Sequence, residues 1–382
     1  MNKVMIVSDY KTGGAGSVAL KTSEILSSHG YIINYIWGVD HFKFSIFNYL
    51  CNVKAYKLLM KELSNHRPDI IMIHNIDNIL SPLVLLAIKN YKKNYNVKVI
   101  FTVHDYHIIS PINSLSYYSG VHKCFFNEPP TILSMLTKKL DRRGYLYGLI
   151  RLLQWYPYYR FIGLRNIIDY FICPSEFMAS KVENHFPEEK VKLIKNPVKF
   201  NAVMSDITND NIIRITFTGR LTQDKGIYPF LKSLASINSE KKIIINLIGD
   251  GEHKDKIENI NIPSWLKINL FGKRDANFVK DTLLASDYVL LPSLCYENAP
   301  LTLVEGVFLG CKIITMNYGG MREIAIKFND SVLLDDLSHS SIYHMIEKIN
   351  KKKPCCQVER QSFFDDYSES NYINKLSPLI MS

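Results

Sequence analysis

The sequence predicts an α/β protein made of two Rossmann-like domains, each built on a doubly wound parallel sheet. Short apolar, β-branched runs alternate with helical stretches up to about residue 195, and the same alternation starts again near residue 212. With 382 residues, of which 47% are hydrophobic and 21% charged, the chain is globular and exceeds the usual size of one hydrophobic core. Ligands of such sheets bind beyond the carboxyl ends of the strands, so the site is expected in the cleft between the domains.

Eleven strands follow from this alternation. The first domain has runs at 3–9, 31–38, 69–75, 97–105, 169–175 and 191–196, and the second at 212–219, 242–251, 267–273, 287–293 and 311–317. The domains are predicted at 1–197 and 198–360, because Asn-Pro in "KNPVKF" interrupts regular structure before the polar stretch 205–211. After "NKKKPCCQ" the segment 361–382 has the spacing of a terminal helix.

The net charge of +10 comes entirely from the first half of the chain. Residues 1–195 hold 24 Lys and Arg against 14 Asp and Glu, whereas residues 196–382 hold 22 of each. A basic half implies an anionic partner, which could be a phosphorylated ligand, an anionic membrane or nucleic acid. No apolar run approaches the roughly 18 residues of a transmembrane helix, and the start of the chain predicts a strand, not a secretory signal. A cytoplasmic location is therefore expected.

The seven cysteines are scattered without a C-x-x-C pair, which argues against a disulfide framework and against a zinc site.

Much of the basic charge lies in an amphipathic segment, 132–166, that contains one acid, Asp141. Leucines, isoleucines, tyrosines and Trp155 accompany the cations, which is typical of a segment that lies on an anionic bilayer. A helix pair packed on the sheet with a solvated basic face explains the pattern as well. Nucleic acid would also match the charge, but no recognised binding motif accompanies it. The cations are Lys138, Lys139, Arg142, Arg143, Arg151, Arg160 and Arg165.

A glycine-rich loop, "KTGGAGSVA" (11–19), follows the first strand. Glycines at this place let the backbone approach a phosphate and open a helix whose N-terminus favours anions. Residues 14–19 also satisfy the dinucleotide fingerprint, with Asp40 near the end of the second strand, and so suggest an NAD-dependent oxidoreductase. That alternative explains nothing in the second half of the chain.

A second loop, "FTGRLTQDKGI" (217–227), places Arg220 and Lys225 after the first strand of the second domain, next to Gly219 and Gly226. Arginine offers a planar fork of donors and lysine a mobile point charge, a combination suited to a diphosphate. Two solvated loop cations are the alternative.

A helix start follows in "CYENAPLTLVEG" (295–306). Asn298 is expected to cap the helix and Pro300 to lie in its first turn. The free N–H groups at such a helix start can bind phosphate oxygens. They belong to Ala299, Leu301 and Thr302.

Two carboxylates flank this helix start. Glu305 lies four residues after Leu301 on the same face, and Glu297 precedes the helix. Two acceptors on either side of a phosphate site suit a nucleotide-sugar, which has hydroxyls on both sides of a diphosphate. A capped and charged surface helix is the alternative.

The stretch "FTVHDYHIISP" (101–111) places His104 and Asp105 at the end of the fourth strand. A histidine at this edge could orient or polarise a reacting hydroxyl, or it could be structural.

Together these motifs resemble the GT-B glycosyltransferases, specifically the retaining family 4 that builds bacterial surface polysaccharides and glycolipids. The resemblance covers most of the chain, and the E-x7-E spacing of Glu297 and Glu305 is specific in that setting. It implies that the terminal helix returns to the first, acceptor-binding domain, and that the second domain binds the donor. The motifs are "GGAG", "TVHDYHIISP", "CPSEF", "IKNPV", "FTGRLTQDKG", "IGDGEHKDKIE", "PSLCYENAPLTLVEG" and "NYGGMREI".

The resemblance also assigns roles. Arg220 and Lys225 would hold the donor diphosphate, Glu305 the ribose hydroxyls, and Glu297 the donor sugar, while His104 would lie beside the anomeric carbon. The resemblance thus makes Arg220, Lys225, Glu297 and His104 the expected catalytic residues, with Glu305 as a donor-binding residue. The remaining donor-binding residues would be Gly13, Gly14, Gly219, Lys273, Asn298, Ala299, Leu301 and Thr302.

The implied activity is transfer of a sugar with retention from a nucleotide-diphosphate-sugar to a lipid-linked saccharide during surface polysaccharide assembly. Neither a metal nor a cofactor is expected, because arginine and lysine neutralise the diphosphate and only Cys124 remains where some relatives carry a cysteine cluster. The enzyme would dock on the inner face of the plasma membrane and bind no nucleic acid. A GT-B epimerase, an NAD-dependent oxidoreductase and a non-catalytic partner of another transferase are the alternatives.

Overall fold

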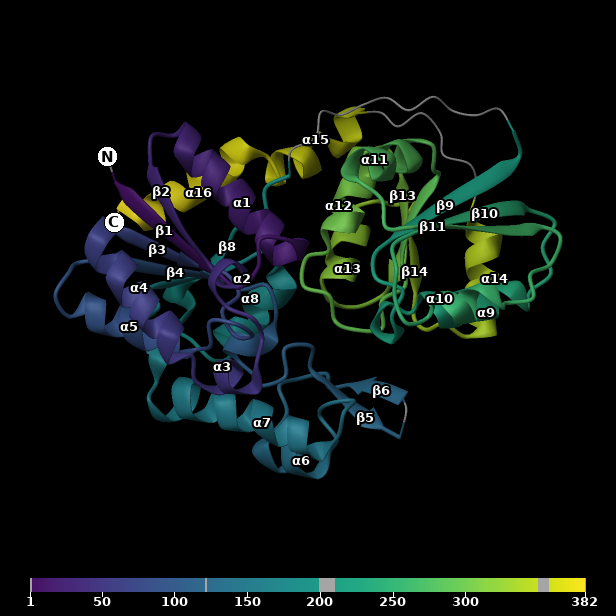
Figure 1. Ribbon diagram of the computed structural model, residues 1–382. Helices are drawn as coiled ribbons and strands as arrows, with labels where there is room; N and C mark the ends of the chain where they lie inside the picture. Colours follow the sequence, from purple (N-terminus) through teal and green to yellow (C-terminus); the bar gives the residue numbers. More distant parts are fainter. Residues whose placement is uncertain (1, 121, 199–209, 350–356, 382) are drawn as a thin grey trace. The chain divides into compact units, whose positions relative to one another are not determined.

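The computed structural model describes residues 2–120, 122–198, 210–349 and 357–381. The chain divides into two compact units, Met1–Pro197 with Asp366–Ser382, and Val198–Asp365 (Figure 1). Most of the polar stretch 205–211 and of "NKKKPCCQ" lies outside the described residues, as do Cys355 and Cys356.

The first unit contains a six-stranded sheet in which all pairings are parallel, with the order β2-β1-β3-β4-β7-β8. All six predicted strands are present. In this order the connections change direction between β1 and β3, which is where a ligand site is expected in an open α/β sheet. The strands are β1 (Lys3–Ser8), β2 (Ile32–Trp37), β3 (Ile70–Ile73), β4 (Lys98–Thr102), β7 (Tyr170–Cys173) and β8 (Val191–Leu193).

Helices cover this sheet, and a hairpin that the sequence did not predict projects from it. The hairpin consists of β5 (Ser116–Ser119) and β6 (His122–Phe125), which pair antiparallel. The helices are α1 (Gly13–Ser28), α2 (Gly38–His41), α3 (Ile46–Leu50), α4 (Val53–His66), α5 (Leu83–Lys92), α6 (Ile132–Thr137), α7 (Tyr145–Trp155), α8 (Glu176–Glu183) and α16 (Glu369–Met381), with short turns η1 (Tyr106–Ile108), η2 (Tyr156–Phe161), η3 (Leu164–Ile167) and η4 (Glu188–Lys190).

The second unit has a parallel sheet with the order β11-β10-β9-β12-β13-β14, which is the strand order of the dinucleotide-binding Rossmann fold. Its switch point lies between β9 and β12. The strands are β9 (Ile212–Thr218), β10 (Lys242–Ile248), β11 (Leu266–Gly272), β12 (Tyr288–Leu291), β13 (Lys312–Met316) and β14 (Val332–Leu334). The helices are α9 (Ile227–Ala235), α10 (Lys254–Glu258), α11 (Ala276–Leu284), α12 (Leu301–Phe308), α13 (Gly319–Ala325), α14 (His339–Lys348) and α15 (Gln357–Asp366), with the turn η5 (Gln223–Lys225).

The prediction of a single terminal helix over 361–382 is wrong, because two helices, α15 and α16, occupy this segment. α15 stays with the second unit, where the buried guanidinium of Arg360 donates to the carbonyls of Val307 and Cys311. A new helix starts after Ser368, whose hydroxyl accepts the N–H of Asn371 at 3.1 Å and so caps α16. α16 belongs to the core of the first unit, and its buried Tyr372 hydroxyl is 2.9 Å from that of Thr22.

Candidate functional site

In the second unit the predicted donor residues come together at the switch point, where β9 and β12 end side by side. Lys225 follows β9, Glu297 follows β12, and the Lys225 ammonium lies 2.5 Å from Glu297 Oε1. The same oxygen accepts hydrogen bonds from Ser293 Oγ at 2.7 Å and from Cys295 Sγ at 3.4 Å. The Glu297 carboxylate is therefore held by three donors from two loops.

The Lys225–Glu297 pair is ionised despite its burial. Burial alone would raise the pKa of Glu297, but the Lys225 ammonium and the hydrogen bonds from Ser293 and Cys295 outweigh this effect, so the pKa lies below its ordinary value. For Lys225, burial opposes the charge, yet Glu297 and its neighbours hold the pKa above its ordinary value. The site thus offers a fixed ammonium group next to a fixed carboxylate.

Backbone contacts lock the surrounding loops to one another. The N–H of Leu294 donates to the carbonyl of Asp224 at 2.8 Å, and the N–H of Gly320 donates to that of Glu297 at 2.8 Å. Gly226 has φ +67° and passes so close to Pro292 that a Cβ would lie 1.9 Å from the Pro292 carbonyl oxygen. Only glycine fits there. The loops after β9, β12 and β13 therefore form one rigid edge of the sheet.

The two other predicted cations of this unit are exposed. Arg220 directly follows Gly219 after β9; its side chain is 72% exposed, with the guanidinium 3.5 Å from the Asp224 carboxylate. Lys273 is exposed after β11, two strands away from β9 in the sheet. Arg220 thus lies in the same loop as Lys225, whereas Lys273 stands further along the edge.

The start of α12 differs from the prediction. Asn298 does not cap the helix with its side chain; Pro300 occupies the N-cap position, and α12 begins at Leu301. The reason is that a residue before proline is kept out of the helical region, so Ala299 stays outside the helix. The N–H groups of Leu301 and Thr302 donate no hydrogen bond within the described part of the chain, because the first helical bond comes from Leu303 to Pro300.

Glu305 lies one turn into α12 and is chemically different from Glu297. Among the residues that the structure describes, its carboxylate has no hydrogen-bond or ion-pair partner, and burial raises its pKa to about 7. A half-buried carboxylate without a partner can accept a hydrogen bond from a ligand hydroxyl. The two glutamates of the E-x7-E motif therefore have distinct states, one paired and one open.

In the first unit His104 lies at the carboxyl end of β4, as predicted, but a second histidine that was not predicted accompanies it. His74 directly follows β3, and its Nδ1 lies 2.8 Å from His104 Nε2. Burial lowers the pKa of His104 to about 4, and it lowers the pKa of His74 well below its ordinary value. Both imidazoles are therefore neutral at physiological pH.

Buried carboxylates surround this edge of the sheet. Asp9 follows β1 and accepts the N–H groups of Asn78 at 2.7 Å and Leu80 at 2.8 Å, and burial raises its pKa to about 7. Burial likewise raises the pKa of Asp77 to about 7; its carboxylate accepts the Tyr159 hydroxyl at 2.7 Å.

Asp105, which the sequence singled out beside His104, caps η1 by accepting the N–H of His107 at 2.9 Å. Its pKa is raised by burial to about 6.

Asp9 and His74 were not predicted as site residues. Each directly follows a strand at the predicted edge of the sheet, and this position is the signal in the sequence that could have identified them.

The glycine-rich loop has the geometry for close approach by a ligand. α1 begins at Gly13, which has φ +81°, and neither Gly13 nor Gly14 has an atom within 4 Å of its Cβ position. Asp40, the acid of the dinucleotide fingerprint, pairs with Lys11 at 2.7 Å. In the dinucleotide interpretation this carboxylate would bind a ribose, whereas here it holds the loop that precedes α1.

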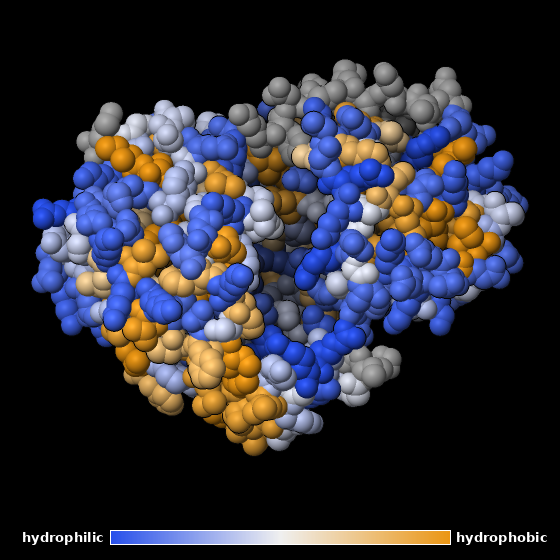
Figure 2. Space-filling model, in the orientation of Figure 1, coloured by the Kyte–Doolittle hydropathy of each residue, from blue (hydrophilic) through white to orange (hydrophobic). Residues whose placement is uncertain are grey.

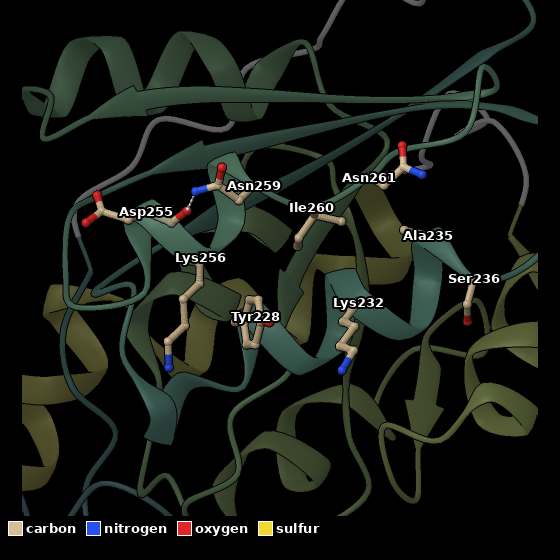
Figure 3. Close-up of a pocket in the computed structure, with 9 residues that line it drawn as sticks. All are labelled: Tyr228, Lys232, Ala235, Ser236, Asp255, Lys256, Asn259, Ile260 and Asn261. Atoms are coloured by element: carbon tan, nitrogen blue, oxygen red, sulfur yellow. Dashed lines mark hydrogen bonds between the residues drawn. The ribbon is translucent and has the colours of Figure 1, made fainter.

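A pocket of about 540 Å³ lies elsewhere on the second unit, in the groove between α9 and α10 (Figure 3). The ring of Tyr228 stands in its centre, with Lys232 and Lys256 on either side. None of the predicted donor residues lines it.

The described ranges contain no cluster of three His, Cys, Asp or Glu side chains placed to hold a metal ion. No helix within them combines the length and the apolar character needed to cross a bilayer. Five cysteines fall in these ranges, and all five are free thiols.

Two family models match the chain in succession. Residues 205–363 match glycosyl transferases group 1, and residues 25–201 match glycosyltransferase family 4. The chain belongs to this glycosyltransferase family. Both matches together span most of its length, as the sequence motifs predicted. The epimerase and oxidoreductase alternatives receive no support from them.

Relatives agree with the family. A protein of 42.6 kDa from the cps region of Klebsiella pneumoniae is 26% identical over 324 residues, which are 85% of this glycosyltransferase and 76% of the relative. A glycogen synthase of Petrotoga mobilis is 25% identical over 268 residues, 66% of this chain and 53% of its own length.

Solved structures agree with the fold. The lipopolysaccharide outer core galactosyltransferase WaaB in its apo form has a TM-score of 0.65 at 14% identity, with 100% of this chain and 99% of that chain covered. HepE of Anabaena, solved with UDP and glucose, has a TM-score of 0.62 at 14% identity with both chains fully covered. The GT-B fold class predicted from the sequence is therefore confirmed.

Replacing Glu305 by Gln is expected to stabilise the glycosyltransferase at pH 8 but not at pH 4. Because burial raises the folded-state pKa to about 7, the folded state binds the extra proton between pH 4.5 and 7, and stability falls as the pH rises through this window. Glutamine carries no charge at any pH, so the variant does not lose this stability when the pH rises. Thermal midpoints of both proteins across pH 4 to 8 measure it, and equal differences at both ends would contradict the assigned environment of Glu305.

Proposed function

We propose that this glycosyltransferase transfers a sugar, with retention and without a metal ion, from a nucleotide-diphosphate-sugar to a lipid-linked saccharide in surface polysaccharide assembly. The observation that carries the proposal is the preformed Lys225–Glu297 site at the switch point between β9 and β12. The relative from a cps region supports the polysaccharide context. HepE, whose matching structure holds UDP and glucose, supports a nucleotide-sugar donor.

The donor would bind along the edge of the second sheet. Lys225 and the exposed Arg220 neutralise the diphosphate, and the unpaired N–H groups of Leu301 and Thr302 add donors at the start of α12. The open carboxylate of Glu305 accepts a ribose hydroxyl. Glu297, which Lys225 and Ser293 hold in place, accepts from the sugar.

Retention in this proposal needs no pair of flanking carboxylates of the glycosidase kind. The acceptor hydroxyl attacks the anomeric carbon on the face of the leaving group, the bond to the diphosphate breaks, and the acceptor proton passes to the departing phosphate oxygen. The protein positions the reactants and stabilises the charge that develops on the phosphate. His104, which is neutral because it is buried, contributes a hydrogen bond near the reacting sugar.

We expect Arg220→Ala to fold normally and to lose roughly 10² to 10³ in turnover, by analogy with the removal of one oxyanion donor. Its side chain is 72% exposed, so little packing is lost. Transfer is measured with UDP- and GDP-sugars and membrane-extracted lipid acceptors, and mass spectrometry of the products separates transfer from epimerisation. Lys348→Ala, at an exposed cation on α14 of the same unit, is the control. Turnover within about twofold of wild type would reject the donor-site assignment.

We further propose that α6 and α7 dock on the anionic inner face of the plasma membrane. The inner face of α7 is fixed to the first unit, since the Gln154 amide donates to the carbonyls of Tyr49 and Asp77, and the Trp155 indole donates to that of His107. The outer face is largely apolar. Leu133 of α6 is 69% exposed and Leu146 of α7 is 67% exposed.

Figure 2 shows an orange, apolar area at the bottom of the first unit, where α6 and α7 lie in Figure 1. A helix pair with a solvated basic face would expose mainly charged side chains, whereas α6, α7 and η2 expose many apolar ones. Arg142 and Arg160 are exposed beside them. Apolar side chains edged by cations favour an in-plane position on an anionic bilayer. The apolar residues are Ile132, Leu133, Leu136, Tyr145, Leu146, Leu149, Leu153, Phe161 and Ile162.

Membrane docking predicts that Leu146→Asn with Leu149→Asn weakens binding to phosphatidylglycerol vesicles by roughly tenfold or more, since each leucine that enters an apolar phase contributes on the order of 1.5 kcal/mol. Co-sedimentation measures the binding, which should also weaken as salt rises. Ile262→Asn with Ile326→Asn, two exposed isoleucines of the second unit, is the matched control. A wild-type protein that ignores these vesicles at low salt would contradict the docking proposal.

A further inference from the structure

His74 and His104 form a hydrogen-bonded pair at the edge of the first sheet. The Nδ1 of His74 is 2.8 Å from the Nε2 of His104, and the ring planes are within 21° of parallel. The ring centroids are 5.1 Å apart. This equals the nitrogen–nitrogen distance plus the distance from each centroid to its own ring nitrogen, which is the largest centroid separation that this nitrogen–nitrogen distance permits. The two nitrogens therefore face each other directly in the ring planes, as a well-aligned hydrogen bond requires.

Neither ring is charged. His74 is fully buried, and burial, followed by the neighbouring His104, lowers its pKa well below the ordinary value. Burial also lowers the pKa of His104 to about 4. The buried acids at this edge, Asp9, Asp77 and Asp105, do not offset these shifts. A neutral imidazole has one nitrogen that donates and one that accepts, so the shared hydrogen bond fixes both tautomers together.

The outer nitrogen of His74 decides which ring donates. His74 Nε2 is buried and has no hydrogen-bond partner within the described ranges. If His104 donated, His74 would carry its proton on Nε2 and leave a buried N–H without an acceptor, which proteins rarely tolerate. If His74 donates from Nδ1, only a lone pair is left unpaired at Nε2. The second arrangement puts the proton of His104 on Nδ1.

We propose that His74 is a positioning residue that holds His104 in the tautomer with a proton on Nδ1. His104 then has a bare Nε2 turned to His74 and an N–H on its other side, where no hydrogen bond is formed with the described residues. This N–H donates to an oxygen of the reacting sugar or acceptor. The inference rests on the proposed function, which puts His104 beside the reaction, and it makes His104 a donor and not a general base.

The tautomer is measured directly by long-range ¹H–¹⁵N NMR of protein labelled at histidine. His104→Gln assigns the signal of His104. In wild type at pH 7.5 we expect protonated Nδ1 and bare Nε2 for His104. In His74→Leu we expect its proton to populate Nε2. A wild-type His104 with its proton on Nε2 would overturn the proposal, whatever the enzyme's activity.

Kinetics test the consequence, with hydrolysis and transfer measured on UDP-glucose, UDP-galactose, UDP-N-acetylglucosamine and GDP-mannose. For the best of these donors, His74→Leu should lower kcat by about tenfold or more with little change in donor KM, as for other partners that orient a functional histidine. His74→Asn keeps a short amide N–H donor near the position of Nδ1 and should restore most of the rate. A His74→Leu enzyme with wild-type kcat, or a His74→Asn enzyme as slow as His74→Leu, would overturn the positioning role.

Thr102→Val is the matched control, since it removes a buried and unpartnered hydroxyl from β4, two residues before His104. It should change neither the tautomer nor kcat, and equal losses in Thr102→Val and His74→Leu would mean that packing alone is responsible.

If His104→Gln kept full activity, the role of His104 in the proposed function would fail, while the NMR result would still stand for the pair. A wild-type enzyme inactive with every donor would reject the proposed function and with it the catalytic consequence, and the tautomer would still be decided.

Discussion

The proposed donor site depends on the ion pair between Lys225 and Glu297. Partial removal of two charges from water is costly, and their attraction offsets this cost only if the geometry is good and the remaining lone pairs are satisfied. Ser293 and Cys295 provide those hydrogen bonds, and their loop is fastened to the loop of Lys225 through Asp224. The pair and the loops therefore stabilise one another. A diphosphate that binds beside Lys225 meets charges already in place, with little reorganisation required.

Strand order explains why the chemistry gathers at these points in both units. The order β11-β10-β9-β12-β13-β14 makes the loops after β9 and β12 neighbours although they are about 70 residues apart in sequence. The order in the first unit makes neighbours of the loops after β1 and β3, which carry Asp9 and His74. The two units thus use different orders of the same architecture, the first with buried neutral histidines and the second with a charged pair.

Much of the fold was predictable because strands buried on both faces appear in sequence as continuous apolar runs. β14 was missed because its short apolar run is followed directly by the acids Asp335 and Asp336, and the β5–β6 hairpin was missed because its Tyr- and Ser-rich strands lack such a run. The break at Ser368 and the displacement of the α12 start by Pro300 depend on single capping positions, which spacing alone does not resolve. For the site, the positions of Lys225, Glu297 and His104 after strands and of Glu305 in the helix after β12 could be predicted, whereas their roles stay predictions. The pairing of Lys225 with Glu297, the open state of Glu305 and the contact of His74 with His104 arise from tertiary packing.

The central claim is that the edge formed by β9, β12 and α12 binds a nucleoside diphosphate. Thermal stabilisation of the full-length protein by UDP, GDP, ADP and NAD⁺, each with wild type and Arg220→Ala, tests it most directly. A ligand at about 100 times its dissociation constant adds roughly 2.7 kcal/mol to the stability of the folded state, which is readily measured. We expect a shift with at least one nucleoside diphosphate that Arg220→Ala largely removes, and none with NAD⁺. A shift with NAD⁺ alone, or a nucleoside diphosphate shift unchanged in Arg220→Ala, would contradict it.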